Sequence, residues 1–313
     1  MEVHYGFEGV ENIQNAILTI GTFDGVHVGH QKIIERLNKE AEKVNGNSVV
    51  FTFFPHPRMV INPDNHGLKL IQTQEEKIET LRKLGLKHLI IFPFTKEFAE
   101  VTAGDFVKKY LVEKLNVKTI VVGYDHQFGK NREGSLSYLQ KVSTEYNFNV
   151  IEIPAHEIDE VNVSSTKIRK AIESGDIRTA NAYLAQPFQL TGTVIHGNKL
   201  GRTIGYPTAN IQVNDPLKII PAIGIYTVKV LFGDNSSYYG MMSIGTNPTV
   251  TDTENIKIEV FIFDFEKEIY GEQVVIQLFE RTRGEYKFES IEKLKERLHQ
   301  DEVEIRTYFG LPH

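Results

Sequence analysis

Short apolar runs alternate with amphipathic stretches over the first half of the chain. Five runs rich in β-branched and aromatic residues are predicted to be strands, at residues 17–20, 48–54, 88–92, 119–123 and 149–153. Between them, apolar residues fall at helical spacing, most clearly at 28–37, 74–84, 103–115 and 136–146. This alternation predicts a parallel sheet covered on both faces, in which ligands bind at the carboxyl ends of the strands.

The pattern changes in the second half. A last predicted helix at 177–184 is followed by Ala185, Gln186 and Pro187, and the proline ends it. Short β segments then recur with turn residues between them, at 188–195, 224–231, 237–244, 256–265 and 273–279, before a helical pattern at 290–309. The spacing predicts an antiparallel barrel or sandwich with a terminal helix. We therefore expect two domains, residues 1–184 and 187–313.

Composition narrows the classes of function. The 313 residues include 35 basic and 41 acidic side chains, a net charge of −6, which disfavours a broad nucleic-acid-binding surface. The absence of cysteine excludes disulfides, thiolate catalysis and cysteine-ligated metal. The first residues lack the pattern of a signal peptide, and no apolar run approaches the length that spans a membrane. We expect a cytoplasmic protein with no nucleic-acid or membrane partner.

A strand, a glycine-rich turn and a helix start follow one another at residues 16–31. The strand stops at Gly21, and His27 and His30 bracket the first turn of the helix. Free backbone N–H groups and the positive end of the helix dipole lie beside these imidazoles, and Gly29 leaves the main chain open to a ligand. The pattern predicts an anion site. Two ordinary surface histidines or a metal pair are alternatives, although no neighbouring ligand set completes a zinc shell.

Three more segments carry polar or aromatic residues where strands end or a helix begins. They are residues 54–58 (FPHPR), the glycine-rich loop 123–134, and 163–169 (VSSTKIR). Each has an ordinary structural explanation, as a rigid turn, a connecting loop and a hydroxyl-capped helix start. Hydroxyls, a guanidinium and a helix N-terminus are also the groups that hold phosphates.

The second half contains a glycine-rich stretch at residues 196–210 (HGNKLGRTIGYPTAN). Its glycines allow the backbone to bend round a ligand, but it lacks the G-K-[ST] of a Walker loop, and a plain β connection is the alternative. Thr208 and Asn210 add two oxygen ligands of the kind that Mg²⁺ prefers, with positions left for water and phosphate.

A carboxylate lies on an aromatic face of the predicted strand 256–265. Alternation places Glu259 on one face with a lysine and three aromatic residues, Lys257, Phe261, Phe263 and Phe265. Such a carboxylate is a candidate functional group. The alternative is a solvated glutamate at the outer end of the strand that pairs with Lys257.

The motif GTFDGVHVGHQ resembles the N-terminal signature of the nucleotidyltransferases that adenylylate flavin mononucleotide (FMN), and the three later segments resemble that pattern in the same order. The resemblance implies a Rossmann-like nucleotidyltransferase domain in which His27 and His30 bind ATP phosphates and stabilise charge on the α-phosphoryl group. It implies further ATP contacts from Gly21, Phe23, Asp24, Gly29, Asp125, Ser165, Thr166 and Arg169. It implies flavin contacts from Phe54, Pro55 and Phe128. His126 stands where the family usually has an aromatic residue.

The stretch after residue 196 resembles the signature of riboflavin kinases, G-x-x-x-G-R-x-I-G-Y-P-T-A-N. The resemblance implies that Thr208 and Asn210 coordinate Mg²⁺-ATP and that Glu259 takes the proton from the ribityl 5′-hydroxyl. Implied ATP contacts are Gly197, Gly201, Arg202, Gly205, Pro207, Thr208 and Asn210. Implied flavin contacts are Glu259, Arg281 and Arg283. Tyr206 and Phe261 depart from the phenylalanine and histidine common in that family.

Together the two resemblances cover residues 20 to about 301, in the order found in bifunctional riboflavin kinase/FMN adenylyltransferases. They imply that the second domain converts riboflavin and ATP to FMN and ADP. The first domain would join FMN to a second ATP, giving flavin adenine dinucleotide (FAD) and pyrophosphate, with Mg²⁺ in both steps. We expect small-molecule partners only, and a monomer or weak homo-oligomer.

Three alternatives stay open. Only one module could be active, the first domain could adenylylate another phosphate ester, or the chain could be a flavin-binding sensor. Because binding alone needs no base, the joint presence of His27, His30, Thr208, Asn210 and Glu259 argues against a sensor.

Overall fold

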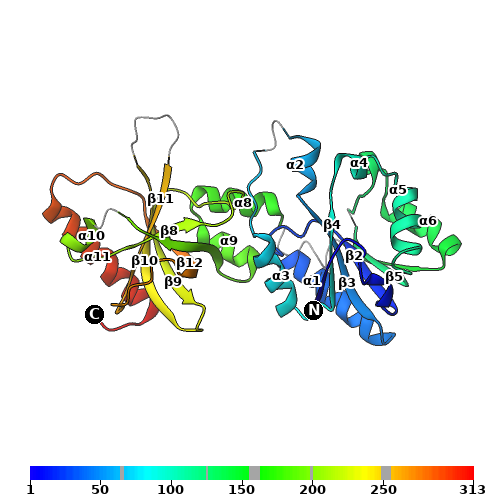
Figure 1. Ribbon diagram of the computed structural model, residues 1–313, viewed down its shortest axis with the longest axis horizontal. Coiled ribbons are helices and arrows are strands. Elements are labelled where there is room, and N and C mark those ends of the chain that lie inside the picture. The colour runs from blue at the N-terminus through cyan, green and yellow to red at the C-terminus, as the bar shows by residue number, and fades with distance from the viewer. Residues whose placement is uncertain (64–66, 125, 155–162, 198–199, 248–254) are drawn as a thin grey trace. The chain divides into compact units, whose positions relative to one another are not determined.

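The computed structural model describes residues 1–63, 67–124, 126–154, 163–197, 200–247 and 255–313. Over these residues the chain divides into two compact units, Met1–Ser165 and Thr166–His313. The first unit is built on an open sheet and the second on a closed barrel (Figure 1). The predicted fold class is confirmed. Among the residues described, no helix has the length and apolar character needed to cross a membrane.

The sheet of the first unit has six parallel strands in the order β1-β4-β3-β2-β5-β6. The strands are β1 (Glu2–Tyr5), β2 (Ala16–Ile20), β3 (Asn47–Phe54), β4 (His88–Pro93), β5 (Thr119–Gly123) and β6 (Asn149–Ile153). The helices are η1 (Val10–Asn12), α1 (Val28–Lys43), α2 (Pro57–Ile61), α3 (Gln74–Lys83), α4 (Lys96–Ala99), α5 (Ala103–Asp105), the π-helix η2 (Phe106–Val112), η3 (Lys130–Arg132) and α6 (Leu136–Tyr146).

Alternate residues of the strands pack into two apolar layers, one on each face of the sheet. On one face Leu18 and Phe51 belong to a cluster with Phe106 of η2. On the other face Ile17 belongs to a cluster with Ile34 of α1. Burial on both faces explains why the strand sequences are apolar at consecutive positions instead of alternating.

The strand order reverses between β2 and β5, because β3 and β4 follow on one side of β2 whereas β6 follows on the other side of β5. In an open parallel sheet the crevice for ligands lies at such a point, outside the carboxyl ends of the strands. A ligand site is therefore expected at the loops after β2 and β5.

The second unit is a closed antiparallel barrel of six strands in the order β10-β11-β8-β7-β12-β9. The strands are β7 (Phe188–Ile195), β8 (Ala209–Val213), β9 (Gly224–Phe232), β10 (Ser237–Asn247), β11 (Asn255–Ile262) and β12 (Gln273–Arg283). The helices are α8 (Ser165–Ser174), α9 (Ile177–Leu184), α10 (Leu200–Thr203) and α11 (Ile291–Phe309). Ile305 of α11 packs with Ile225, Met241 and Phe263, so the terminal helix covers part of the barrel.

The structure differs from the sequence-based elements at several points. The strands β1 and β8 were not predicted. The predicted helix 103–115 is α5 followed by the π-helix η2. After Phe54 the chain starts the short helix α2, which was not expected after two prolines; Pro57 fits its first turn because the missing N–H needs no partner there. The strand predicted to reach Phe265 ends at Ile262, ahead of a left-handed Asp264 with φ of 54°.

The helices α8 and α9 group with the barrel, apart from the first residue of α8. The domain boundary predicted after residue 184 would instead leave them with the sheet. That boundary remains a prediction about the limits of the functional domains.

Candidate active sites

The loop after β2 has an unusual backbone. Phe23 and Val26 have φ values of 48° and 37°, in the left-handed region that a β-branched residue rarely adopts, and Gly25 lies between them at 90°. The Phe23 ring packs under Gly21 and against the imidazole of His30, with ring centroids 4.7 Å apart. A strained backbone of this kind persists only where the surroundings hold it, and it is common at ligand sites.

Buried hydrogen bonds hold this loop. The Asp24 carboxylate, 2% exposed, accepts from the Ile71 backbone N–H at 3.0 Å. The Asp24 carbonyl oxygen accepts from the Ser165 hydroxyl at 2.9 Å. The Lys77 ammonium, on α3, donates to the Thr22 carbonyl oxygen at 2.9 Å. Asp24 and Ser165 of the predicted ATP site therefore meet here, in contacts that support the loop itself.

His27 and His30 stack at the start of α1, with ring centroids 3.7 Å apart and planes inclined by 17°. His27 caps the helix, since its Nδ1 accepts from the His30 backbone N–H at 3.4 Å. This contact places the proton of the neutral imidazole on Nε2. The His30 Nδ1 is buried and has no hydrogen-bond partner among the described residues. Such a pair offers ring N–H donors to an anion at the helix N-terminus.

Burial lowers the pKa values of three groups at this loop, His27, His30 and Lys77. It lowers the pKa of His27 to about 4, against the opposing effect of Asp24. Burial, followed by the charges of His27 and Lys77, holds the pKa of His30 well below its usual value. Burial also lowers the pKa of Lys77 to about 8. A phosphate placed here would favour the protonated forms, so the site suits an anionic ligand.

The predicted flavin contacts of the first unit differ in exposure. Phe54 ends β3 and is 42% exposed, next to Pro55. Phe128 is buried, and it packs against Phe106 with ring centroids 5.7 Å apart. His126 stacks on Phe128 at 5.8 Å. Phe54 thus presents a ring to solvent, whereas Phe128 belongs to the core.

The other predicted ATP contacts lie outside the loop after β2. Gly29 is buried in the first turn of α1. Thr166 is exposed and Arg169 is buried, both on α8 and within the second unit. Asp125 lies outside the described residues.

In the second unit, the stretch before β8 folds tightly around its glycines. A Cβ on Gly197 would collide with the Asn210 amide, and a Cβ on Gly201 would collide with the Tyr206 carbonyl oxygen. Gly205 has a φ of 89°, in the left-handed region. The glycine pattern is therefore required by the loop's own packing before any ligand is considered.

Thr208, Asn210 and Glu259 come together on the wall of the barrel. Asn210 of β8 is the antiparallel partner of Glu259 on β11. The Thr208 hydroxyl donates to Glu259 Oε1 at 3.2 Å. The Lys257 ammonium lies 2.9 Å from the same oxygen. Because Ile258 and Val260 point into the barrel, the half-buried Glu259 side chain lies on the outer face.

Of these three residues, Thr208 also lines a pocket of about 450 Å³. Thr208, Pro207 and Arg202 line one part of it, and the Arg202 guanidinium lies 3.6 Å from Glu268. The other lining residues are mostly apolar or lysine and glutamate: Val194, Ala209, Val260, Ile262, Phe265, Glu266, Lys267, Ile269 and Tyr270. The pocket joins apolar walls to polar groups, as ligand sites do.

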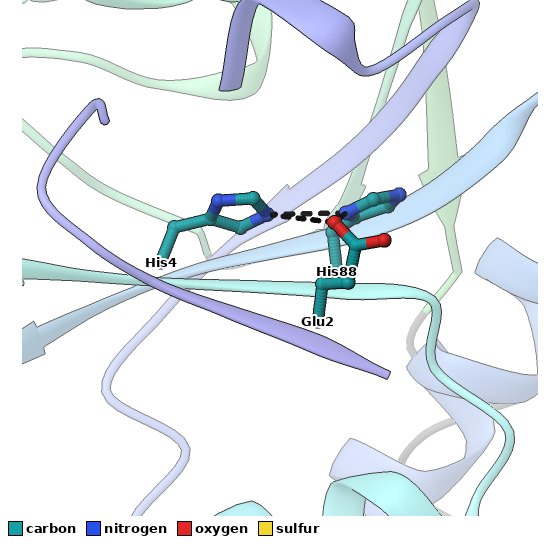
Figure 2. A group of neighbouring side chains, drawn as sticks. All are labelled: Glu2, His4 and His88. Carbon is teal, nitrogen blue, oxygen red and sulfur yellow. Dashed lines mark hydrogen bonds and ion pairs between the residues drawn. The ribbon is translucent and has the colours of Figure 1, made fainter. Parts of the chain in front are cut away.

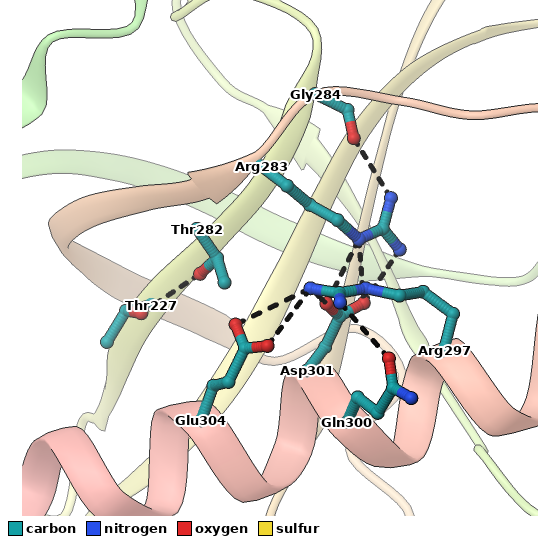
Figure 3. A network of polar contacts seen from close by, with 8 residues as sticks. All are labelled: Thr227, Thr282, Arg283, Gly284, Arg297, Gln300, Asp301 and Glu304. Atoms are coloured by element: carbon teal, nitrogen blue, oxygen red, sulfur yellow. Dashed lines mark hydrogen bonds and ion pairs between the residues drawn. The ribbon is translucent and has the colours of Figure 1, made fainter.

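The predicted flavin contacts Arg281 and Arg283 lie at the end of β12. Figure 3 shows Arg283 and Arg297 converging on Asp301 of α11. A guanidinium nitrogen of each arginine lies 2.7 Å from an Asp301 carboxylate oxygen. The Asp301 side chain is fully buried, so this network fastens β12 to α11. Arg281 donates to the Ile223 carbonyl oxygen, and its Nε has no partner among the described residues.

Neither Lys77 nor Asp301 was predicted from the sequence. A lysine on an amphipathic helix is ordinary, so Lys77 carried no signal; only the fold shows that it is buried beside the histidine loop. Lys257 was considered only as the partner of a solvated glutamate, and the structure shows the pair together with Thr208.

Comparisons with known proteins find matches to both halves of the chain. Residues 10–167 match the family model described as FAD synthetase, and residues 184–309 match the model described as riboflavin kinase. A bifunctional riboflavin kinase/FMN adenylyltransferase of Listeria monocytogenes is 39% identical over 95% of this chain and 93% of the relative. The Escherichia coli K12 protein of the same name is 35% identical over 97% of each.

A solved structure has the same fold over nearly its whole length. It comes from Streptococcus pneumoniae, is named macrolide-efflux protein, and is 34% identical over 98% of this chain and 99% of that one, with a TM-score of 0.88. Its name differs from those of the Listeria and Escherichia relatives, while its fold covers both units described above.

Proposed function

The chain belongs to the family of bifunctional riboflavin kinase/FMN adenylyltransferases, and we propose that the loop after β2 and the stretch before β8 carry its two active sites. The enzyme phosphorylates riboflavin with ATP to give FMN, and it transfers the adenylyl group of ATP to FMN to give FAD and pyrophosphate.

Adenylyl transfer is assigned to the loop after β2. His27 and His30 donate ring N–H groups to ATP phosphates and stabilise the charge that develops at the α-phosphorus. An oxygen of the FMN phosphate attacks that phosphorus, and the bond to pyrophosphate breaks. The attacking oxygen is already anionic, so this step needs no general base. The remaining ATP contacts of the proposal are Gly21, Phe23, Asp24, Gly29, Asp125, Ser165, Thr166 and Arg169, and the flavin contacts are Phe54, Pro55 and Phe128.

The stacked imidazoles of His27 and His30 at the N-terminus of α1 are the observation that supports this assignment. Lys77 belongs to the same proposal, because its ammonium is anchored to the Thr22 carbonyl of the same loop. Asp24 accepts hydrogen bonds from Ile71 and Ser165, and these contacts shape the loop without involving the reacting atoms.

Riboflavin phosphorylation is assigned to the group formed by Thr208, Asn210 and Glu259. Thr208 and Asn210 offer a hydroxyl and an amide oxygen, donors that suit Mg²⁺, which when bound would neutralise phosphate charge. Glu259 accepts the proton of the ribityl 5′-hydroxyl while that oxygen attacks the γ-phosphorus and the bond to ADP breaks. The proposal keeps Gly197, Gly201, Arg202, Gly205 and Pro207 at the nucleotide, and Arg281 and Arg283 at the flavin.

The 3.2 Å contact between Thr208 and Glu259 supports this second assignment. The 2.9 Å contact between Lys257 and Glu259 also fits the alternative of a simple surface ion pair, which substitution of Glu259 distinguishes. For both assignments together, incubation with riboflavin, ATP and Mg²⁺ followed by chromatography should yield FMN first and FAD later. Formation of FMN alone would leave only the kinase assignment standing.

We further propose that the enzyme acts in the cytoplasm, where its substrate ATP is made, as a monomer or weak homo-oligomer without nucleic-acid partners. Sedimentation of the full chain across a range of concentrations tests its oligomeric state. The functional domains are proposed to be residues 1–184 and 187–313.

A further inference from the structure

Two histidines and a glutamate meet at the edge of the sheet in the first unit (Figure 2). Glu2 and His4 are alternate residues of β1, and Glu2 is the parallel partner of His88 at the start of β4. Alternation therefore puts all three side chains on one face of the two strands. No motif in the sequence joins them, because 84 residues separate His4 from His88.

The three ligand atoms lie close to one another. His4 Nε2 is 3.1 Å from His88 Nδ1, and Glu2 Oε2 is 4.0 Å from the first and 3.7 Å from the second. Two nitrogen ligands of one tetrahedral Zn²⁺, at bonds of about 2.05 Å, stand about 3.3 Å apart. The distances in the cluster are therefore close to those of a metal shell.

A backbone carbonyl orients His4 for ligation. The His4 Nδ1 lies 3.2 Å from the Glu8 carbonyl oxygen, which can only accept a hydrogen bond. In the neutral imidazole the proton is then on Nδ1, and the lone pair of Nε2 points toward His88. Metal-bound histidines usually have such a carbonyl or carboxylate behind them.

The burial of the three side chains suits a ligand set. The two imidazoles are largely buried, whereas Glu2 is 74% exposed and leaves an entrance for an ion.

We propose that Glu2, His4 and His88 bind a divalent transition metal, with Zn²⁺ as the best match, and that the ion fastens β1 to the sheet. Two imidazoles and one carboxylate leave a fourth position for water. The cluster lies at the amino ends of β1 and β4, whereas the adenylyl-transfer loop follows the carboxyl end of β2. The ion is therefore a structural element and takes no part in either reaction.

The test is metal binding by the full chain after removal of metals with a chelator. Titration with Co²⁺ should give the visible absorption of tetrahedral nitrogen and oxygen ligation at one equivalent, and Zn²⁺ should displace it. His4→Gln and His88→Gln should each weaken Zn²⁺ binding by about 10²-fold or more, and Glu2→Gln by about 10-fold. Zn²⁺ at a hundredfold excess over Kd should raise the Tm of the wild type by about 5 °C or more.

Two control variants separate this site from other histidines. His299→Gln changes an exposed histidine of α11, and His27→Ala opens the stacked pair of the adenylyl site; both should bind Zn²⁺ as the wild type does. Glu2→Gln alters only an exposed side chain, so it reports on the site even if a histidine variant fails to fold. Unchanged binding in Glu2→Gln and His88→Gln, loss of binding in His27→Ala, or no binding tighter than millimolar would overturn the proposal and leave a hydrogen-bonded histidine pair.

Discussion

The two candidate sites handle ATP with opposite kinds of side chain. At the loop after β2, the stacked imidazoles lie near the Lys77 ammonium, and the Asp24 carboxylate accepts from the Ile71 backbone N–H. On the barrel wall, the half-buried Glu259 carboxylate lies beside a hydroxyl and an amide. The first site is rich in hydrogen-bond donors, and the second has a carboxylate that can accept a proton.

The nucleophiles explain this difference. The phosphate of FMN is already an anion at neutral pH, so its attack needs stabilisation of charge and no base. The 5′-hydroxyl of riboflavin must lose a proton as it attacks, which requires an acceptor within hydrogen-bond reach. The comparison leads us to expect that removing the base affects one reaction only and that removing a donor affects the other only.

The largest expected effect is that of Glu259→Gln, which keeps the size of the side chain and removes its basicity. FMN formation from riboflavin should fall by about 10² to 10⁴-fold, since that is the usual contribution of a general base. FAD formation from supplied FMN should continue. Chromatographic initial rates for each product measure both.

Glu272→Gln, at an exposed carboxylate of the same unit, is the matched control and should leave both rates unchanged. If Glu259→Gln phosphorylates riboflavin at nearly the wild-type rate, Glu259 is only the ion-pair partner of Lys257, and the contrast between the two sites fails.

His27→Ala tests the other side of the comparison. Losing one preorganised donor should lower FAD formation from FMN by on the order of 10²-fold, with kinase turnover unchanged. A parallel fall of both rates in a folded variant would mean that His27 supports structure. A smaller loss confined to KM for ATP would assign it to ground-state phosphate binding.

A pair of C-terminal fragments tests whether the kinase site works without the adenylyl-transfer site. A fragment from Pro187 to His313 should be soluble, phosphorylate riboflavin and make no FAD, because the barrel and α11 share a core. A longer fragment from Thr166 should be more stable by about 2 kcal/mol, since Asn181 of α9 donates to the Leu278 carbonyl at 2.8 Å and accepts from the Phe188 N–H at 2.7 Å.

Denaturant titration of the two fragments measures this difference. Equal stabilities would show that α9 contributes nothing to the barrel, whereas kinase activity in neither fragment would show that the kinase site needs residues of the first unit.

Lys77→Met should have the smallest effect. It should weaken ATP binding and make the folded protein more stable at neutral pH. The apparent KM for ATP in adenylyl transfer should rise about 10-fold through loss of a charged hydrogen-bond donor. Because burial lowers the pKa of Lys77 to about 8, the unfolded chain binds this proton more tightly between pH 8 and about 10.5. Below pH 8 the burial of the charged lysine therefore lowers the free energy of unfolding of the wild type. This loss diminishes as the pH rises from 8 to about 10.5, and Lys77→Met should not show it.

Lys83→Met, at an exposed lysine of the same helix, is the control and should show neither change. ATP-dependent initial rates and Tm values from pH 7 to 10 are the measurements. A variant that is less stable at pH 7 with unaltered KM would mean that Lys77 only holds the loop through Thr22.

Some residues of the candidate sites could be named from the sequence and others could not. The sequence was sufficient for His27, His30, Thr208 and Asn210, because each lies in a short continuous motif whose spacing fixes which groups are neighbours. Lys77 could not be named from the sequence, because its contact depends on the packing of α3 beside a loop some fifty residues earlier. Arg283 was named for the flavin, but its partner Asp301 on α11 could not be anticipated from any local pattern.

The sequence by itself determined the alternation of strands and helices, the change to antiparallel β structure and the two signatures, because these depend on local periodicity and turn chemistry. Tertiary structure alone decided the order β1-β4-β3-β2-β5-β6, the pairing of Asn210 with Glu259, and the meeting of Glu2 and His4 with His88. Strand pairing is a long-range choice made by the packing of whole layers. The same packing desolvates His27 and Lys77, so their pKa values belong to the fold and not to the motif.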